Sequence, residues 1–227
     1  MAGTGSKLQF VFVIEAVVFD LDGVLIQSEE VWHAVRERYV RERGGRYDED
    51  VQRAMMGMSA PEWSRFLHEE AGVPDAPDAI NREVVERMLE AYGRELPLLP
   101  GAADAVRRAA EAFPLALASS SNREVFEAVL ELAGLADCFR ATVSSEEVAR
   151  GKPAPDVYLE AAHRLGVVPE RCAAVEDSHA GIRSAKAAGM RVVAIPNASY
   201  PPDEEALALA DAVVPSLDEL TTTVLHG

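Results

Sequence analysis

The chain has 227 residues, of which 48% are hydrophobic and 26% are charged, values that are ordinary for a globular protein with its own core. Its 38 acidic residues exceed its 22 basic residues and give a formal net charge of −16. This charge argues against nucleic acid as a partner, because binding a polynucleotide requires a basic surface. The cysteines Cys138 and Cys172 show no disulfide or zinc spacing, and no apolar run is long enough for a membrane helix, so we expect a cytoplasmic protein.

The first predicted element is a strand over residues 14–19, which follows the unassigned residues 1–6. The run is short, apolar and rich in β-branched residues, and it ends at Asp20. This pattern is typical of a central parallel strand that is buried on both faces. Asp22 and Gly23 then predict a loop at the carboxyl end of the strand.

Charged residues become dense after Ser28, and apolar residues recur there at helical spacing. The first helix contains Trp32 and ends at Gly44. Two further helices are predicted over residues 62–70 and 79–91, and no strand is predicted in this part of the chain. The pattern therefore indicates an all-helical insertion after the first strand and its loop.

After residue 100, short apolar strands alternate with helices. The predicted strands cover residues 115–118, 141–144, 172–175, 191–195 and 212–214. The predicted helices cover residues 102–112, 123–133, 155–165, 178–188 and 204–210. Such alternation predicts an α/β fold with a parallel sheet and helices on both faces.

Polar residues follow four of the predicted strands. They are Asp20 with Asp22, Ser119, Lys152, and Glu176 with Asp177. Ligands bind outside the carboxyl ends of the strands in an open α/β sheet, so we expect these side chains to meet at one site. Carboxylates suit a Mg²⁺ ion, whereas a hydroxyl and an ammonium group suit a phosphate.

Four motifs in this order and spacing resemble those of the haloacid dehalogenase superfamily. They are Asp20-Leu21-Asp22-Gly23-Val24, Ser119, Lys152-Pro153 and Glu176-Asp177-Ser178. The helical insertion resembles the cap of the subfamily that includes β-phosphoglucomutase and many sugar phosphatases. The resemblance implies a Rossmann-like, doubly wound core over residues 1–26 and 96–227, with a helical cap domain over residues 27–95.

The resemblance also implies catalytic roles. Asp20 is expected to be the nucleophile that forms an aspartyl-phosphate. Asp22 is expected to protonate the leaving alcohol and then to activate water. Lys152 is expected to stabilise charge on the transferring group, and Ser119 to donate a hydrogen bond to it.

The binding residues follow from the same resemblance. The expected Mg²⁺ ligands are Asp20, Asp22 through its backbone carbonyl, Asp177 and, directly or through water, Glu176. The expected phosphate-binding residues are Gly23, Ser119, Ser120 and Lys152. Residues of the cap and rim that we expect to set substrate specificity are Trp32, His33, Met58, Ser59, Ser121 and Asn122.

The first motif narrows the reaction. With an acidic residue at Asp22, the motif resembles that of the phosphatases and phosphomutases of the superfamily. The dehalogenases of the superfamily lack this acid, because their chemistry needs no proton for the leaving group. Residues 28–93 contain no lysine. The chain therefore also differs from the phosphonoacetaldehyde hydrolase branch, which uses a cap lysine.

Compared with the β-phosphoglucomutases, the chain lacks positive charge where a second phosphate is held. At the position of Trp32 those mutases have a histidine of the cap, and at the position of Ala60 they have an arginine. The position of Asn122 is often a lysine in them, and the position of Gln27 is usually an acidic residue. We therefore predict hydrolysis of a small phosphate monoester, a sugar or polyol phosphate by family analogy.

Two alternatives remain open. One is a β-phosphoglucomutase-like mutase in which Arg65 or His33 replaces the missing cap residues. The other is a non-catalytic binding protein on the same fold. The expected partner is a small phosphorylated metabolite, and a monomer is expected, with an oligomer as the alternative.

Overall fold

The computed structural model describes residues 13–55, 58–197 and 200–227, so residues 1–6 lie outside the described part. Within that part, six parallel strands form one sheet. In spatial order they are β3 (Phe139–Ser144), β2 (Leu115–Ser119), β1 (Ala16–Phe19), β4 (Cys172–Glu176), β5 (Arg191–Ala194) and β6 (Ala212–Val213). The predicted parallel α/β core is therefore confirmed.

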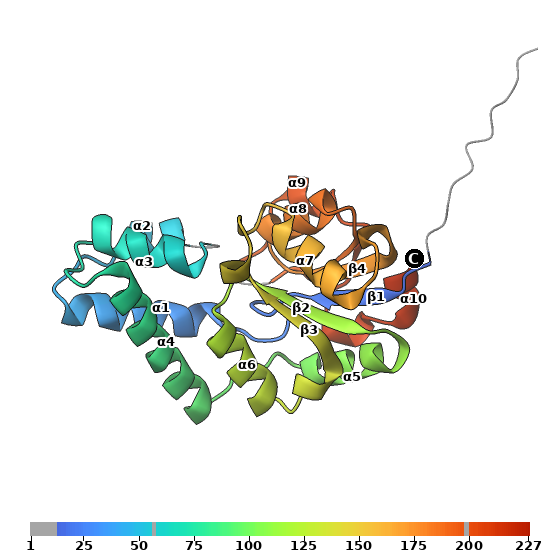
Figure 1. Ribbon diagram of the computed structural model, residues 1–227, viewed down its shortest axis with the longest axis horizontal. Coiled ribbons are helices and arrows are strands. Elements are labelled where there is room, and N and C mark those ends of the chain that lie inside the picture. The colour runs from blue at the N-terminus through green and yellow to red at the C-terminus, as the bar shows by residue number, and fades with distance from the viewer. Residues whose placement is uncertain (1–12, 56–57, 198–199) are drawn as a thin grey trace, which may run out of the picture.

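Both faces of the sheet are covered by helices, because successive side chains of a strand point to opposite sides. Val17 packs in the layer with α5 and α6, and Val18 packs in the layer with α7 and α8. These helices are α5 (Ala102–Ala112), α6 (Arg123–Leu132), α7 (Asp156–Leu165) and α8 (His179–Ala187). Figure 1 shows the two layers on opposite sides of the strands. Two short helices, α9 (Glu204–Leu207) and α10 (Thr222–His226), complete the carboxyl-terminal part.

The insertion after β1 folds into helices that lie beyond one end of the sheet (Figure 1). They are α1 (Glu29–Glu42), α2 (Glu49–Met55), α3 (Ala60–Glu69) and α4 (Pro77–Arg94). The short helix α2 was not predicted, because it has only two buried apolar residues, Val51 and Met55. Its start is stabilised by Asp48, whose Oδ1 accepts a hydrogen bond of 3.0 Å from the backbone of Val51.

The two connections between core and insertion run side by side. The backbone of Gln27 donates to the carbonyl of Pro97 at 2.8 Å, and that of Leu99 donates to Leu25 at 2.9 Å. The predicted boundaries at residues 26–27 and 95–96 fall beside this paired segment. The division of the chain into two domains stays a prediction.

Candidate active site

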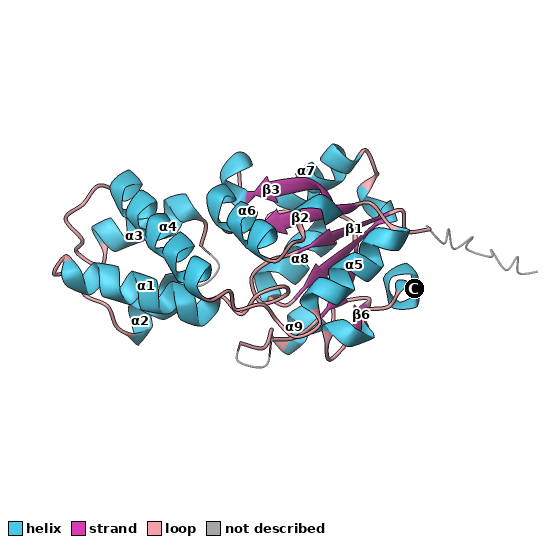
Figure 2. Cartoon of the chain, turned by 90° about the horizontal axis from the view of Figure 1, so that it is seen from below, coloured by secondary structure: helices cyan, strands magenta, loops and turns pink. Residues whose placement is uncertain are grey.

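The spatial order of the strands reverses at β1, which lies between β2 and β4. In open α/β sheets, ligands bind at the carboxyl ends of the strands near such a point. Asp20 directly follows β1, Asp177 directly follows β4, and Ser119 is the last residue of β2. Figure 2 shows the strand arrows pointing toward α1 and α4, so this end of the sheet faces the insertion.

Lys152 joins the ends of two neighbouring strands. Its Nζ donates to Oδ1 of Asp20 at 2.8 Å and to Oε1 of Glu176 at 2.6 Å. Only 5% of the lysine side chain is exposed. The hydroxyl of Tyr158, on α7, also donates to Oε1 of Glu176, at 2.7 Å. The ammonium group is therefore held in one place between two buried carboxylates.

The buried position of this cluster changes its ionisation. Burial raises the pKa of Asp20 to about 8; Lys152 opposes this shift, whereas Glu176 and Asp22 add to it. Burial also raises the pKa of Asp177. Burial alone lowers the pKa of Lys152, but the charges of Asp20 and Glu176 outweigh it and raise the pKa above its usual value. The carboxyl groups would thus ionise more readily if further positive charge were bound beside them.

The donor atoms fit a hard divalent cation. One oxygen each from Asp20, Glu176 and Asp177 lies within 4.8 Å of the others. Oδ1 of Asp177 is buried and has no hydrogen-bond partner among the described residues. Oxygen ligands of this kind are preferred by Mg²⁺ and Ca²⁺. Because both Glu176 oxygens already accept hydrogen bonds, from Lys152 and from the Ser178 hydroxyl, Asp177 is better placed as a direct ligand.

Two glycines leave room for these carboxylates. A Cβ on Gly23 would collide with the Asp177 carboxylate, and a Cβ on Gly181 would collide with that of Glu176. Gly23 also has a φ of +82°, which other residues rarely adopt. Its N–H donates to the carbonyl of Ile26 at 2.8 Å, so its clear contribution is space, and its phosphate-binding role stays a prediction.

Asp22 is oriented by two serines at the end of β2. Its Oδ2 accepts hydrogen bonds from Ser121 at 2.8 Å and from Ser119 at 3.3 Å. Its Oδ1 is buried and has no hydrogen-bond partner among the described residues. Ser121, which we expect at the substrate-binding rim, also donates its hydroxyl to the carboxylate that is expected to transfer protons.

A cavity of about 180 Å³ connects this cluster to the insertion. Its core side includes Asp20, Asp22, Ser120, Ser121, Asn122, Lys152 and Asp177. Its insertion side includes Glu29, Trp32, His33, Arg36, Tyr47, Met58 and Trp63. The structure thus brings most of the predicted catalytic and specificity residues to one cavity.

Other predicted residues lie differently. Ser59 does not line the cavity; its backbone and hydroxyl both donate to Glu62, at 2.8 and 2.6 Å, at the start of α3. Asn122 lines the cavity and joins the core to the insertion, because its side chain donates to Asn81 on α4 at 3.1 Å. Arg65 is exposed on α3 and does not line the cavity, so it does not replace the missing cap arginine.

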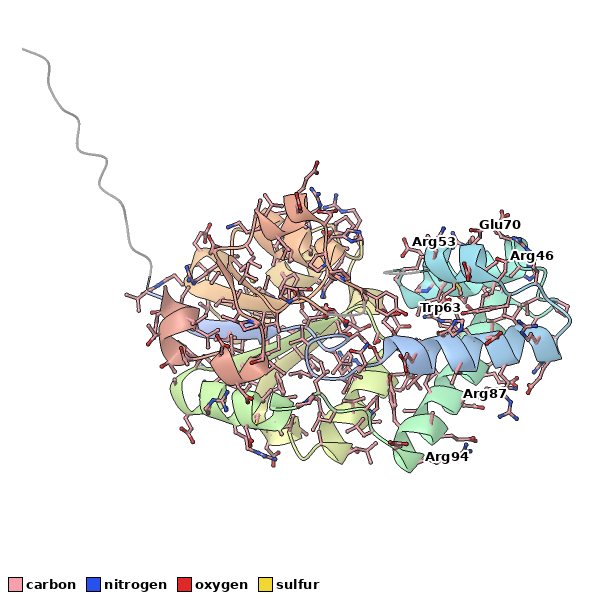
Figure 3. All side chains as sticks on the ribbon, turned by 180° about the vertical axis from the view of Figure 1, so that it is seen from behind. Arg46, Arg53, Trp63, Glu70, Arg87 and Arg94 are labelled. Carbon is pink, nitrogen blue, oxygen red and sulfur yellow. The ribbon has the colours of Figure 1, made fainter. Side chains whose placement is uncertain are left out.

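Several residues that line the cavity were not predicted from the sequence, among them Glu29, Arg36 and Tyr47. Glu29 and Arg36 lie seven residues apart on α1, with Trp32 between them, so all three share one face of the helix. This spacing was visible, but an isolated helix does not show whether that face meets the core or a cavity. Figure 3 shows Trp63 inside the insertion, whereas Arg46, Arg53 and Arg94 lie on its outside.

The chain is similar to known proteins over most of its length. A family model described as haloacid dehalogenase-like hydrolase matches residues 14–189. Hexitol phosphatase B of Escherichia coli (strain K12) is 34% identical over 220 residues, which cover 94% of this chain and 97% of that protein. The bifunctional riboflavin kinase/FMN phosphatase of Arabidopsis thaliana is 34% identical over 203 residues; these cover 88% of this chain but only 53% of that protein, so the chain spans about half of its length.

A solved structure agrees with this similarity. CbbY from Rhodobacter sphaeroides, crystallised with phosphate, is 31% identical and superimposes with a TM-score of 0.84, covering 93% of this chain and 99% of that one. A mutant of the same protein, crystallised with xylulose-(1,5)-bisphosphate, superimposes equally well. None of the helices in the described part of the chain combines the length and the apolar character needed to span a bilayer. Because the family model covers most of the chain and full-length relatives exceed 30% identity, the chain belongs to the haloacid dehalogenase-like hydrolase family.

Proposed function

We propose that the protein is a Mg²⁺-dependent phosphatase that hydrolyses a small phosphate monoester, a sugar or polyol phosphate, through an aspartyl-phosphate. The convergence of Asp20, Asp22 and Lys152 on one cavity carries this proposal. These groups supply a nucleophile, a proton donor and a cation at one place. Two relatives support the substrate class: one is named hexitol phosphatase B, and the other, CbbY, was crystallised with a sugar bisphosphate.

In this proposal, a carboxylate oxygen of Asp20 attacks phosphorus while the ester P–O bond breaks. Lys152, at 2.8 Å from Asp20, favours the ionised form of the nucleophile and offsets charge on the phosphoryl oxygens. The attack joins the phosphoryl group to Asp20 and releases the alcohol.

Asp22 would give its proton to the leaving oxygen in the first step and take a proton from the attacking water in the second. The water then breaks the aspartyl-phosphate, which releases inorganic phosphate and restores Asp20. The hydrogen bonds from Ser119 and Ser121 hold Oδ2 of Asp22, which leaves Oδ1 for the reacting atoms.

Further roles in this proposal concern the cation, the phosphate and the insertion. Asp20 and Asp177, with Asp22 and Glu176 assisting, would hold Mg²⁺, and the bound ion would supply positive charge that offsets repulsion between these carboxylates and the phosphoryl group. Ser120 lines the cavity and would contribute to phosphate binding. The insertion would act as the cap, which covers the site and excludes water.

The test is phosphate release from a panel of hexose, pentose and polyol phosphates, with Mg²⁺ or with EDTA. We expect Mg²⁺-dependent release that falls at least about 10³-fold in Asp20→Asn. The matched control is Asp104→Asn, an exposed carboxyl on α5, which should keep wild-type activity. Near-full activity of Asp20→Asn would exclude the covalent mechanism.

The alternatives predict other results in the same assay. A mutase would convert β-glucose 1-phosphate to glucose 6-phosphate with a bisphosphate primer and would release little phosphate. A binding protein would retain Mg²⁺ and ligands without turnover of any ester. Either result would replace the phosphatase proposal.

A further inference from the structure

Arg36 occupies an unusual place on the insertion side of the cavity. Its guanidinium carbon lies 4.5 Å from the ring centre of Trp32 and 4.8 Å from that of Trp63. The two indole rings belong to α1 and α3, and Figure 3 shows Trp63 inside the insertion. Contacts of this kind attract a cation to the faces of the rings and help to hold it in a fixed position.

The charge of Arg36 is not paired within the described part of the chain. Its Nε is buried without a hydrogen-bond partner, and no described carboxylate lies within 4 Å of the guanidinium. By contrast, Arg43 lies 2.9 Å from Asp75 and 2.6 Å from Glu83, in the same insertion. Burial lowers the pKa of Arg36 only to about 10, so the side chain is charged at neutral pH. The side chain is half-buried, and a partly desolvated charge without an ionic partner is unfavourable, so a ligand can supply the missing anion.

The position of Arg36 in the cavity suggests which part of a substrate it meets. Arg36 lines the same cavity as Asp20 and Asp22. Glu29 lines it too and is the first residue of α1, the helix that follows the loop of Asp22. Seven residues of helix separate Glu29 from Arg36, a rise of about 10 Å. A substrate that reacts at Asp20 would therefore pass Glu29 and reach Arg36 with its far end.

The charged residues around the cavity favour a single negative charge at the far end of the substrate. Lys152 is already shared by two carboxylates of the core. His33 faces the hydroxyl of Tyr47 at 3.4 Å and Glu37 at 3.7 Å. The guanidinium of Arg36 therefore remains on this side of the cavity, which the carboxyl group of Glu29 also lines, and it matches a singly charged carboxylate better than a doubly charged phosphate. An arginine binds a carboxylate through two parallel N–H groups.

We propose that Arg36 binds a carboxylate at the end of the substrate remote from the phosphoryl group. This inference rests on the proposed phosphatase function and specifies, among small phosphate monoesters, those of polyhydroxy carboxylic acids, which are the oxidised counterparts of sugar and polyol phosphates. Arg36 is then the residue that selects these esters over the corresponding alcohols.

Matched pairs of esters test the proposal. 6-Phosphogluconate and glucitol 6-phosphate have the same carbon chain and differ only in a terminal carboxylate or hydroxymethyl group. The pairs 4-phosphoerythronate with erythritol 4-phosphate, and 3-phosphoglycerate with glycerol 3-phosphate, test shorter chains. For the pair of best-fitting length, we expect kcat/KM to favour the acid by about 10- to 100-fold.

Three variants assign the preference to a residue. In Arg36→Gln the ratio of acid to alcohol should fall at least about tenfold, mainly through a higher KM for the acid. Arg36→Lys should retain an intermediate ratio, because lysine keeps the charge but lacks the forked geometry. Arg65→Gln, at an exposed position outside the cavity, should keep the wild-type ratio. Melting temperatures report whether each variant is folded.

Binding measurements test this inference separately from the proposed phosphatase function. In an Asp20→Asn background, calorimetry measures the affinity of each ester without turnover. If the acid binds more tightly than the alcohol, and Arg36→Gln removes this difference, the inference is supported. This holds even if the wild-type protein releases no phosphate, because that result would refute the phosphatase proposal alone. Equal affinity for acid and alcohol, or equal losses for both in Arg36→Gln and Arg36→Lys, would overturn the inference. Preference for fructose 1,6-bisphosphate over every acid and alcohol would assign Arg36 to a phosphate instead.

Discussion

On the core side of the cavity, Lys152 lies within 2.8 Å of Asp20 and 2.6 Å of Glu176. On the insertion side, Arg36 is held between two indole rings and no described carboxylate lies within ion-pair distance of it. On the core side, the ammonium group is therefore paired before a ligand arrives, whereas on the insertion side the guanidinium has no ionic partner among the described residues until a ligand supplies one. The core side is thus suited to general phosphoryl chemistry, and the insertion side is suited to recognising the rest of the substrate.

The same contrast appears in what stabilises each side. The core cluster consists of charged groups fixed by hydrogen bonds at the ends of buried strands. The insertion side depends on aromatic packing: the ring centres of Trp32 and Trp63 lie 6.2 Å apart, and both side chains are buried. Changes on the core side should therefore affect catalysis most, and changes on the insertion side should affect packing and selectivity.

The largest effect is expected from Lys152→Met, because this change leaves Asp20 and Glu176 buried without their shared cation. We expect phosphate release to slow about 10²- to 10³-fold and the free energy of unfolding to fall by about 3–5 kcal/mol. Steady-state kinetics and urea unfolding measure the two losses. Lys186→Met, which breaks a partly exposed pair with Asp211, should cost less than about 1 kcal/mol. Equal costs for the two lysines would contradict the distinction between the buried cluster and a surface pair.

A second change tests the packing of the insertion. Trp63 is 2% exposed, so Trp63→Ala should lower the free energy of unfolding by about 3–5 kcal/mol through loss of buried contacts and the cavity left behind. Urea unfolding followed by far-ultraviolet circular dichroism measures it. Arg53→Ala, on the outer surface of α2, should change stability by no more than about 0.5 kcal/mol. A loss below about 1 kcal/mol for Trp63→Ala would show that the aromatic pair is not what stabilises this side.

The smallest effect concerns pH and the cation. Burial raises the pKa of Asp20 from 3.8 to about 8, so between these values the folded protein holds a proton that the unfolded chain has lost. Stability without added cation should therefore decrease as the pH rises through this interval. Mg²⁺ competes with that proton, so the increase in Tm caused by Mg²⁺ should be a few degrees larger at pH 8 than at pH 5.

Calorimetry with Mg²⁺ or EDTA at several pH values measures this difference. Asp104→Asn, which removes an exposed carboxyl, should leave the pH dependence as it is in the wild type. Asp20→Asn should reduce it, because the titrating group is gone. An effect of Mg²⁺ that is the same at every pH would argue against these carboxylates as the cation site.

The site on the core side could be predicted because its residues end a strand or lie in the loop that comes after one. Asp20 and Asp177 are placed by the ends of β1 and β4, and a parallel sheet brings those ends together. Ser59 shows the limit of such reasoning, since its hydrogen bonds to Glu62 fix the start of α3 and remove it from the cavity. Arg36, in contrast, lines the cavity but was not predicted to, because an arginine on an amphipathic helix usually faces solvent.

The sequence by itself determined the order of strands and helices, the helical character of the insertion and the chemistry at the strand ends, because these depend on local periodicity and on residues adjacent to each strand. Only the tertiary structure decided which face of α1 meets the cavity. The packing of α3 against α4 and of α1 against α4 places Trp63 beside Trp32 and leaves Arg36 between them. That outcome depends on contacts between residues far apart in the chain, which no local pattern of spacing records.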